Sequence, residues 1–400
     1  MMKKDRSKVV CLYPDGEKAA VKGVKEWSEE MLTAVFAEPG GGYGLSAGAD
    51  FYRERRRVGN YRAAAEAAVR VAFPSVRTVV HHPEEVSVSH IRRQEAFNDL
   101  NGGELGFVAV YFNPCGYNAP RANFERFIER FDWMKDRLLV VELAFGDQAF
   151  SLTDRAGNLL QLRSDSVLWQ KEALINVGTQ ILRERGFVNV GWLDGDTDIQ
   201  NCGEDWFECV CRALDESAAV QVAEKIICEF TDQRQDSLGA AANFIHGRLP
   251  IEQIYKTGLG WAVRGELWDG LGWYEDSVIG AGDQLAFLAT VGAAAKAGQW
   301  AQFNNNAKYL EGYQHWATEW SDRVGGAVGF VKDYTALAEP HGSHSNRQYH
   351  SRELILSKFG FDPGRDLLKA TGSPLEWSAN AAGLLRTAVL DHFYQRREDG

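Results

Sequence analysis

Two acidic residues after an apolar segment are the clearest candidates for chemistry in this chain of 400 residues. The segment Val188–Leu193 is short and mainly apolar, which predicts a buried β-strand. Asp194 and Asp196 follow it directly, and in an extended chain this spacing would place both carboxylates on one side. Two neighbouring carboxylates repel each other unless a cation lies between them, and hard oxygen ligands suit Mg²⁺ or Mn²⁺.

The place of these acids at the end of a strand also points to a binding site. Open α/β sheets bind their ligands beyond the carboxyl ends of the strands, and Asp194 and Asp196 would lie there. An acidic turn without a function fits the same residues, because Asp and Gly are ordinary turn residues. The residue types alone leave both interpretations open.

Two groups of polar residues occur further along the chain. The first runs from Trp273 through Asp276 to Gly280-Ala-Gly-Asp283, and the second contains His341, His344, Arg347 and Arg352. A carboxylate within reach of a hydroxyl can act as a general base, and glycines let the backbone approach a ligand closely. The first group also fits a turn whose Asp caps a helix over Gln284–Ala295. A lone histidine is often simply a surface or core residue.

The elements around the acids alternate between strands and helices. Apolar segments predict strands at Phe107–Phe112, Leu138–Phe145 and Leu159–Arg163. Helical spacing joins Phe124 to Phe131, and a second helix should begin near Ser166 and contain Leu174, Val177 and Ile181. This alternation predicts an α/β fold with a mainly parallel sheet and helices on both faces.

The remaining part of the chain gives a less regular pattern. We expect a helix over Ala218–Ile227, a polar and loop-rich region over Thr231–Gly247, and a C-terminal helix from Leu384 to Phe393. Residues 1–104 differ in pattern and are interpreted as an N-terminal extension, while residues 105–400 form the main domain. Within that domain we separate residues 105–200, 201–360 and a C-terminal helical segment over 361–400.

Composition limits the class of protein. Hydrophobic residues make up 45% of the chain, which indicates a globular protein, and the formal net charge of −11 argues against a general polyanion binder. The six cysteines lack paired metal spacing, so we expect a reduced, cytoplasmic setting. No apolar run has the length of a membrane span. Twelve tryptophans could stack on sugars, although tryptophan more commonly fills cores.

The N-terminal extension contains interleaved cations and aromatic residues. They lie in Phe51–Arg57 and Asn60–Arg62, and such a pattern can contact phosphates and stack on bases. A solvated helix face with internal ion pairs fits the same residues. The glycines at residues 40–44 are not followed by the Gly-Lys-Ser/Thr of a phosphate-binding loop.

Taken together, an α/β half ending in Asp-x-Asp, a glycine-rich acidic segment and a late His-Gly with Arg resemble the nucleotide-sugar glycosyltransferases of the A-type fold. The similarity covers about residues 105–400 and is strongest to branches with a galactosyltransferase-type C-terminal segment. It implies a Rossmann-like GT-A fold and transfer of a hexose from a nucleoside-diphosphate sugar. Residues 105–200 would then be the nucleotide-binding half and residues 201–360 the acceptor and catalytic half. The first hundred or so residues are not explained by it.

The resemblance also implies roles for individual residues. Asp194 and Asp196, with His341 or alternatively His344, would hold Mn²⁺ or Mg²⁺ against the donor diphosphate. Asp283 would be the catalytic base of an inverting reaction, and Asp276 is the second candidate. Gly282 stands where the family often has Glu. Further donor contacts are implied at Phe112, Asn113, Pro114, Arg163, Lys171, Trp273, Gly282 and Arg347.

The acceptor and the oligomeric state stay open at this level. The N-terminal cations favour a hydroxymethylated pyrimidine in DNA, whereas the acidic net charge favours a polysaccharide or a lipid-linked sugar. A nucleotidyltransferase is a further alternative, but the turn Asn113-Pro-Cys-Gly is not a basic nucleotide loop. A non-catalytic carbohydrate-binding protein is the third, and it would not need the clustered acids.

Overall fold

The computed structural model describes residues 8–12, 18–22, 77–81, 100, 102–152, 158–349 and 351–400. The chain forms two compact units, Met1–Ser89 and His90–Gly400. In the first unit, β1 (Lys8–Leu12) pairs antiparallel with both β2 (Lys18–Lys22) and β3 (Arg77–His81). The sequence patterns at residues 40–44, 51–57 and 60–62 lie outside the described residues. The expected domain boundary after residue 104 falls inside the first strand of the second unit.

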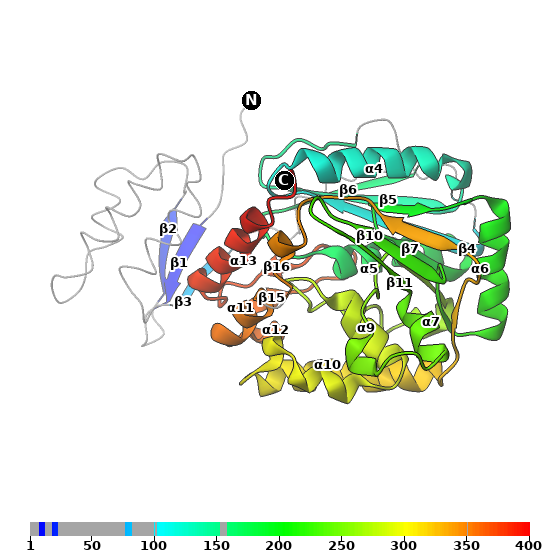
Figure 1. Cartoon of the computed structure of the whole chain (residues 1–400). Helices are drawn as coiled ribbons and strands as arrows, with labels where there is room; N and C mark the ends of the chain where they lie inside the picture. The colour runs from blue at the N-terminus through cyan, green and yellow to red at the C-terminus, as the bar shows by residue number, and fades with distance from the viewer. Residues whose placement is uncertain are drawn as a thin grey trace, which may run out of the picture. The chain divides into compact units, whose positions relative to one another are not determined.

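A seven-stranded sheet forms the centre of the second unit (Figure 1). Its strands in spatial order are β13 (Val328–Phe330), β9 (Ala219–Gln221), β12 (Gly260–Arg264), β7 (Phe187–Leu193), β4 (Gly103–Phe112), β5 (Leu138–Phe145) and β6 (Leu159–Ser164). Neighbouring strands pair in parallel except where β12 lies antiparallel between β9 and β7. The predicted α/β fold with a mainly parallel sheet is therefore confirmed.

Alternating side chains of the central strand β4 divide the core into two layers. Leu105, Phe107, Ala109 and Tyr111 pack against α4 (Asn118–Arg130) and α6 (Glu204–Glu216). Val108 and Val110 point to the other face, which α5 (Lys171–Glu184) covers. Figure 1 shows α4 on one side of the sheet, with α5, α9 (Gly282–Thr290) and α10 (Ala307–Val324) on the other. Helices on both faces explain why β5 is buried along its whole length.

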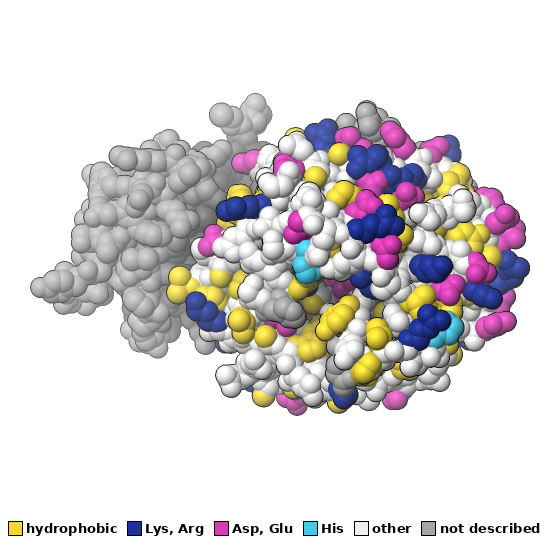
Figure 2. Space-filling model, viewed as in Figure 1, with side chains coloured by type: hydrophobic (Ala, Val, Ile, Leu, Met, Phe, Trp, Pro, Cys, Tyr) yellow, Lys and Arg dark blue, Asp and Glu magenta, His cyan; other side chains and the backbone are white. Residues whose placement is uncertain are grey.

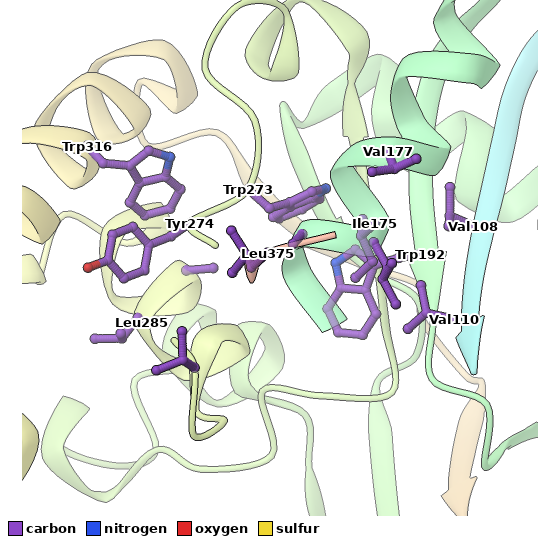
Figure 3. Packing of buried hydrophobic residues seen from close by; sticks show 14 of the residues in the cluster. Val108, Val110, Ile175, Val177, Trp192, Trp273, Tyr274, Leu285, Trp316 and Leu375 are labelled. Carbon is purple, nitrogen blue, oxygen red and sulfur yellow. The ribbon is translucent and has the colours of Figure 1, made fainter. Parts of the chain in front are cut away.

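Aromatic side chains fill the second layer of the core. Trp192 of β7 meets Trp273 edge-on at 6.3 Å between ring centroids (Figure 3). Trp273 in turn packs on Trp320 at 5.0 Å. The same layer contains Tyr274 and Trp316, whose rings are 5.3 Å apart. Most of the described tryptophans are buried, namely Trp192, Trp206, Trp261, Trp273, Trp316, Trp320 and Trp377. These tryptophans are core residues, so they do not support the hypothesis of a surface that stacks sugars.

A smaller sheet lies next to the carboxyl end of β7. Its strands in spatial order are β11 (Arg234–Leu238), β10 (Lys225–Glu229), β14 (Thr335–Ala338) and β8 (Thr197–Ile199). Among the described residues, the remaining elements are α7 (Ala240–Ile245), α8 (Gly265–Trp268), α11 (Glu353–Lys358), α12 (Pro363–Asp366), α13 (Gly383–Gln395), β15 (Leu367–Leu368), β16 (Glu376–Trp377) and the short 3₁₀ turns η1 (Asp132–Met134), η2 (Ile251–Gln253), η3 (Ala294–Gln299), η4 (Ala301–Phe303) and η5 (Ser345–Arg347).

Two expectations for the middle of the chain are wrong. The helix expected over Ala218–Ile227 is replaced by β9 and β10, because pairing of β9 between β12 and β13 overrides the local helical preference. The region expected to be loop-rich, Thr231–Gly247, contains β11 and α7. β11 is a partly exposed edge strand of polar residues, so it lacks the apolar alternation that marks a half-buried strand.

Other boundaries shift by a few residues. The helix expected to begin near Ser166 begins at Lys171, and the helix expected over Gln284–Ala295 is α9, which starts at Gly282 and ends at Thr290. The C-terminal helix α13 covers the predicted Leu384–Phe393. The start of α5 matters for the site, because it places Lys171 at the helix terminus beside the end of β7.

Candidate active site

The chain turns sharply between the two acids. β7 ends at Leu193, and the backbone N–H of Thr197 donates to the carbonyl oxygen of Asp194 at 3.0 Å. The extended conformation that was expected for Asp194 and Asp196 is therefore wrong, because this hydrogen bond closes a turn between β7 and β8. The two carboxylates diverge toward different partners. Their side chains stay 21% and 22% exposed, so both are accessible to a ligand.

Asp194 is held by a lysine and by the backbone. Its Oδ1 lies 3.1 Å from Nζ of Lys171, and its Oδ2 accepts from the N–H of Leu259 at 2.9 Å. The ammonium group of Lys171 also lies over the ring of Trp192, 4.3 Å from its centroid. Burial raises the pKa of Asp194 although Lys171 opposes it, and Asp196 and Asp283 add to the rise. Burial alone would lower the pKa of Lys171, but Asp194, Asp283 and Glu172 raise it.

Asp283, in the first turn of α9, also lies close to Asp194. Its Oδ2 accepts a hydrogen bond from the hydroxyl of Thr257 at 3.2 Å. A Cβ added to Gly258 would lie 3.0 Å from Oδ2 of Asp283 and 3.2 Å from Oδ2 of Asp194, so both carboxylates lie against this glycine. Ala281, just before α9, has a left-handed φ of 72°. Such strained backbone gathers at functional sites.

Glu172 is a buried acid that the sequence interpretation missed. Its side chain follows Lys171 in α5 and packs against Gly282, where a Cβ would clash with the carboxyl group. Its Oε1 has no hydrogen-bond partner among the described residues. Burial raises the pKa of Glu172 to about 7, with Lys171 opposing the rise and Asp283 adding to it. Glu172 is thus positioned to hold or release a proton beside Asp283.

Asp196 meets a histidine from far along the chain. Its Oδ2 lies 3.0 Å from Nε2 of His341, and Nδ1 of His341 lies 3.1 Å from Oε1 of Glu398. The hydrogen bond and charge of His341, with the charge of Arg347, lower the pKa of Asp196 against the effect of burial. Burial would raise the pKa of Glu398, but Arg396, His341 and Arg347 hold it well below its usual range. The structure therefore places His341 beside Asp196.

Three buried arginines surround this histidine and the turn before α9. Arg347, Arg352 and Arg396 are 8%, 7% and 4% exposed, and Arg396 lies over the ring of Trp169 at 5.2 Å. A Cβ added to Gly280 would lie 2.9 Å from Nη1 of Arg352, so the guanidinium group packs against this glycine. The Nε atoms of Arg347 and Arg352 have no hydrogen-bond partner among the described residues. Burial first, and repulsion from Arg396 second, lower the pKa of both groups, so an anion would be stabilised here.

Several residues implied as donor contacts have structural partners instead. Arg163 donates to backbone carbonyls of Gly146 and Gln148, the latter at 2.8 Å. Asn113 closes a turn with Tyr117, accepting from its N–H at 3.0 Å, and the carbonyl oxygen of Pro114 accepts from the side chain of Gln148. The ring of Phe112 packs edge-on against the ring of Trp169 at 5.2 Å. Phe112 thus helps to fix the aromatic ring on which Arg396 lies.

The alternative residues lie in other surroundings. Asp276 pairs with Lys369, and its carbonyl oxygen accepts from the hydroxyl of Tyr309 at 2.9 Å. The ring of His344 packs near Phe230 and Tyr349, at 5.0 and 5.6 Å. None of these contacts joins Asp276 or His344 to Asp194 or Asp196. The contacts thus favour Asp283 over Asp276, and His341 over His344, as members of the candidate site.

The described residues contain no group of three or more His, Cys, Asp and Glu side chains placed to hold a metal ion. The donor types of a smaller site are nevertheless present, since Asp196 offers oxygen and His341 nitrogen. Figure 2 shows a hollow near the middle of the viewed face, with hydrophobic, acidic, basic and histidine side chains around it. Within the part of the chain that the structure describes, every helix is too short or too polar to traverse a bilayer.

The fold and the site define an α/β protein with its candidate site at the carboxyl end of the central sheet. No protein-family model and no curated protein matches this chain. Among solved structures, it is similar to S. aureus TarS residues 1–349, with 12% identity, a TM-score of 0.33 and coverage of 74% of this chain and 71% of that chain. It is also similar to 4-diphosphocytidyl-2C-methyl-D-erythritol synthase from Anaerococcus prevotii, with 11% identity, a TM-score of 0.28 and coverage of 64% and 98%. Likeness at this level carries no argument about function.

Proposed function

We propose that residues 90–400 form a glycosyltransferase that moves a sugar from a nucleoside-diphosphate sugar to an acceptor hydroxyl. The observation that carries the proposal is the convergence of four distant segments on the turn after β7. In this turn, Asp194 pairs with Lys171 and Asp196 contacts His341, which in turn contacts Glu398. Asp283 and Asp194 lie against the same glycine, Gly258, and Glu172 packs beside the start of the helix that carries Asp283. Acids, one histidine and buried arginines together are the groups that transfer from a diphosphate sugar requires.

The departure of a diphosphate needs positive charge that does not depend on proton transfer. Arg347 and Arg352 supply it, because both are buried and keep an Nε without a hydrogen-bond partner in the described structure. Arg352 lies against Gly280, two residues before the helix that carries Asp283. A phosphate oxygen at this place would lie close to the sugar's reacting carbon, and Lys171 would add to the positive field.

A divalent cation fits one side of the site. Asp196 and His341 are adjacent, whereas both oxygens of Asp194 already have partners in Lys171 and Leu259. Mn²⁺ or Mg²⁺ held by Asp196 and His341 would neutralise the leaving diphosphate, whose oxygens are themselves good ligands. Asp194 then acts through Lys171 and through the shape of the turn, and His344 has no part in the site.

Asp283 is the proposed general base. It lies at the start of α9, is partly exposed, and accepts a hydrogen bond from Thr257 on the side of Asp194. A carboxylate that takes the acceptor's proton during direct attack gives inversion at the anomeric carbon. Asp276 is unsuitable for this role because its carboxylate pairs with Lys369.

The acceptor proposed from the sequence is a hydroxymethylated pyrimidine in DNA. Its support comes from cations and aromatic residues at 51–62, which lie outside the described residues. Binding of duplex DNA that weakens steeply with salt would support this acceptor. Absence of such binding, with transfer to a glycan or a lipid-linked sugar, would replace it without affecting the transferase proposal.

A donor screen tests the transferase proposal directly. The full chain is incubated with a panel of nucleoside-diphosphate sugars, with and without Mn²⁺, and release of nucleoside diphosphate is measured. We expect one donor to be hydrolysed slowly in an Mn²⁺-dependent manner. Release of pyrophosphate from a nucleoside triphosphate and a sugar phosphate would instead identify a nucleotidyltransferase. Binding of sugars without any turnover would identify a carbohydrate-binding protein.

A further inference from the structure

His392 is a buried histidine whose ring has no hydrogen-bond partner. The residue is 2% exposed, and neither Nδ1 nor Nε2 forms a hydrogen bond with any described residue. A neutral imidazole carries one N–H and one lone pair, and the polar atoms of a buried ring normally have partners. Since both nitrogens lack a partner, His392 has an unused N–H whichever nitrogen carries the proton.

The helix that carries His392 turns the ring toward the interior of the second unit. The buried face of α13 consists of Leu385, Val389, His392 and Phe393, so an apolar side chain at position 392 would continue this face. Arg396 follows one helical turn later on the same side of the chain and is 4% exposed. A polar ring at such a position costs free energy unless it finds a hydrogen-bond partner.

Arg352 brings a second unused donor to the same region. It directly precedes α11, a helix that packs on α13, and it is 7% exposed. Its Nε has no hydrogen-bond partner among the described residues. Its guanidinium group packs against Gly280, which lies just before the helix that carries Asp283. Arg352 therefore connects the surroundings of His392 with the candidate active site.

Positive charge is in excess in this region. Glu398 pairs with Arg396 and lies 3.5 Å from Nη1 of Arg347, whereas no ion pair joins Arg352 to a described carboxylate. Burial, and then the charges of Arg396 and Arg352, lower the pKa of His392 to about 3, as expected for a ring close to both guanidinium groups. A buried cation without a counter-ion and a buried N–H without an acceptor are both satisfied by one kind of ligand, an anion.

We propose that His392 and Arg352 together bind a phosphate of the donor's diphosphate, His392 through its ring N–H and Arg352 through its Nε hydrogen. The identity of the ligand rests on the proposed function, whereas the anion site itself rests on the two unused donors. The proposal gives the C-terminal helix α13 a part in donor binding. A phosphate fits this place better than a water molecule, because water leaves the buried charge of Arg352 without a counter-ion.

The first test measures binding of inorganic pyrophosphate to the full chain by isothermal titration calorimetry, without metal. We expect His392→Leu to weaken this binding by about 10- to 100-fold, the usual effect of one hydrogen bond to a charged group. His392→Gln keeps a side-chain N–H and should bind more tightly than His392→Leu. The matched control is His315→Leu, because His315 is an exposed histidine of α10. Equal binding by the wild type and His392→Leu, or no binding by the wild type, would overturn the inference.

The stability of the same variant distinguishes a binding role from a structural one. Replacing an unpartnered polar ring by an apolar side chain removes a cost to the fold. Without pyrophosphate, His392→Leu should therefore melt at the same temperature as the wild type or higher. A lower melting temperature together with unchanged pyrophosphate binding would show that His392 is structural, and would overturn the inference.

Competition separates this inference from the proposed function. The nucleoside diphosphate released from the donor found in the screen should displace pyrophosphate from the wild type. Failure to displace it would overturn the assignment to the donor's diphosphate and leave the transferase proposal intact. If no donor is found, weaker pyrophosphate binding by His392→Leu would still support the anion site, while the proposed function would fail.

A second measurement uses only the wild-type protein. Crystals are soaked in tungstate, a heavy analogue of phosphate, and the bound anion is located by its anomalous scattering. We expect tungstate within hydrogen-bond distance of the ring of His392 and of Nε of Arg352. An ordered water alone at this place, or tungstate bound only elsewhere, would overturn the inference whatever the behaviour of the variants.

Discussion

Two acids that are separated by a single residue in the chain, Asp194 and Asp196, have different partners. The lysine side of the site, defined as Lys171, Glu172, Asp194 and Asp283, pairs Asp194 with a fixed ammonium group. The histidine side, defined as Asp196, His341, Arg347 and Glu398, pairs Asp196 with an imidazole. An ammonium group has no lone pair and cannot ligate a metal ion, whereas a neutral imidazole nitrogen can.

This difference separates stability from ligand binding. On the lysine side, removal of either charge leaves the other poorly solvated, which is costly for the fold. On the histidine side, a neutral replacement can keep the hydrogen bond to His341, so the fold loses little. We therefore expect the lysine side to dominate the free energy of unfolding and the histidine side to dominate metal binding.

The largest effect is expected at Asp283, the one member of the lysine side that we assign to catalysis. Asp283→Asn should lower turnover by about 10²- to 10⁴-fold, the usual contribution of a general base, with donor binding unchanged. Donor turnover and donor binding are measured on the same preparation. Asp276→Asn is the matched control, because Asp276 pairs with Lys369 away from the acid pair. Full turnover by Asp283→Asn would remove this residue from the mechanism.

Lys171 should give the largest change in stability. Lys171→Met leaves Asp194 without its cation, which we expect to lower the free energy of unfolding by about 3–5 kcal/mol. Urea unfolding of the variant and the wild type measures this difference in the free energy of unfolding. The double variant Lys171→Met with Asp194→Asn should recover most of the loss, since no charge is then left alone. A single variant as stable as the wild type would show that the ion pair is not coupled to folding.

Glu172 gives a pH-dependent effect of intermediate size. Burial raises the pKa of Glu172 to about 7 from its ordinary value of 4.5, so the folded state binds more protons between these two pH values. The free energy of unfolding therefore falls as pH rises from about 4.5 to 7. Since one pKa unit corresponds to roughly 1.4 kcal/mol, the fall is at most about 3 kcal/mol.

Glu172→Gln removes this cost, so it should stabilise the fold at pH 8 and have little effect near pH 4.5. Urea unfolding of the variant and the wild type at both pH values makes the comparison. A gain of equal size at both pH values would mean that the ionisation of Glu172 is not responsible.

The smallest effect on stability is expected on the histidine side. Asp196→Asn keeps an oxygen that can contact His341 at the partly exposed end of the turn, so it should change the free energy of unfolding by no more than about 1 kcal/mol. The same variant should lose Mn²⁺ binding. Destabilisation as large as that of Lys171→Met would abolish the contrast between the two sides.

The sequence predicts four of the seven strands of the central sheet and places two acids at the end of one of them. Continuous apolar runs predicted β4, β5, β6 and β7, because a buried parallel strand must be apolar on both faces. The rule that ligands bind at carboxyl ends of strands placed Asp194 and Asp196 at the candidate site. The structure then placed Asp283 beside Asp194 and His341 beside Asp196.

The rest depends on contacts that no local pattern encodes. Glu398 lies in a short charged stretch that resembles any solvated terminus, and only the docking of this stretch on α4 turns it toward His341. Glu172 resembles an ordinary first-turn acid of a helix until Gly282 packs against it. β9 has residues that suit a helix, and only its two partner strands make it extended. In each case the decisive partner is distant in sequence.

The most direct test of the central claim is a crystal structure of the full chain with Mn²⁺ and a nucleoside diphosphate. The account predicts one Mn²⁺ coordinated by Asp196 and Nε2 of His341, with phosphate oxygens facing Arg347 and Arg352, and with the Lys171–Asp194 pair intact. A nucleotide bound elsewhere, or Mn²⁺ coordinated by Asp194 after displacement of Lys171, would contradict it.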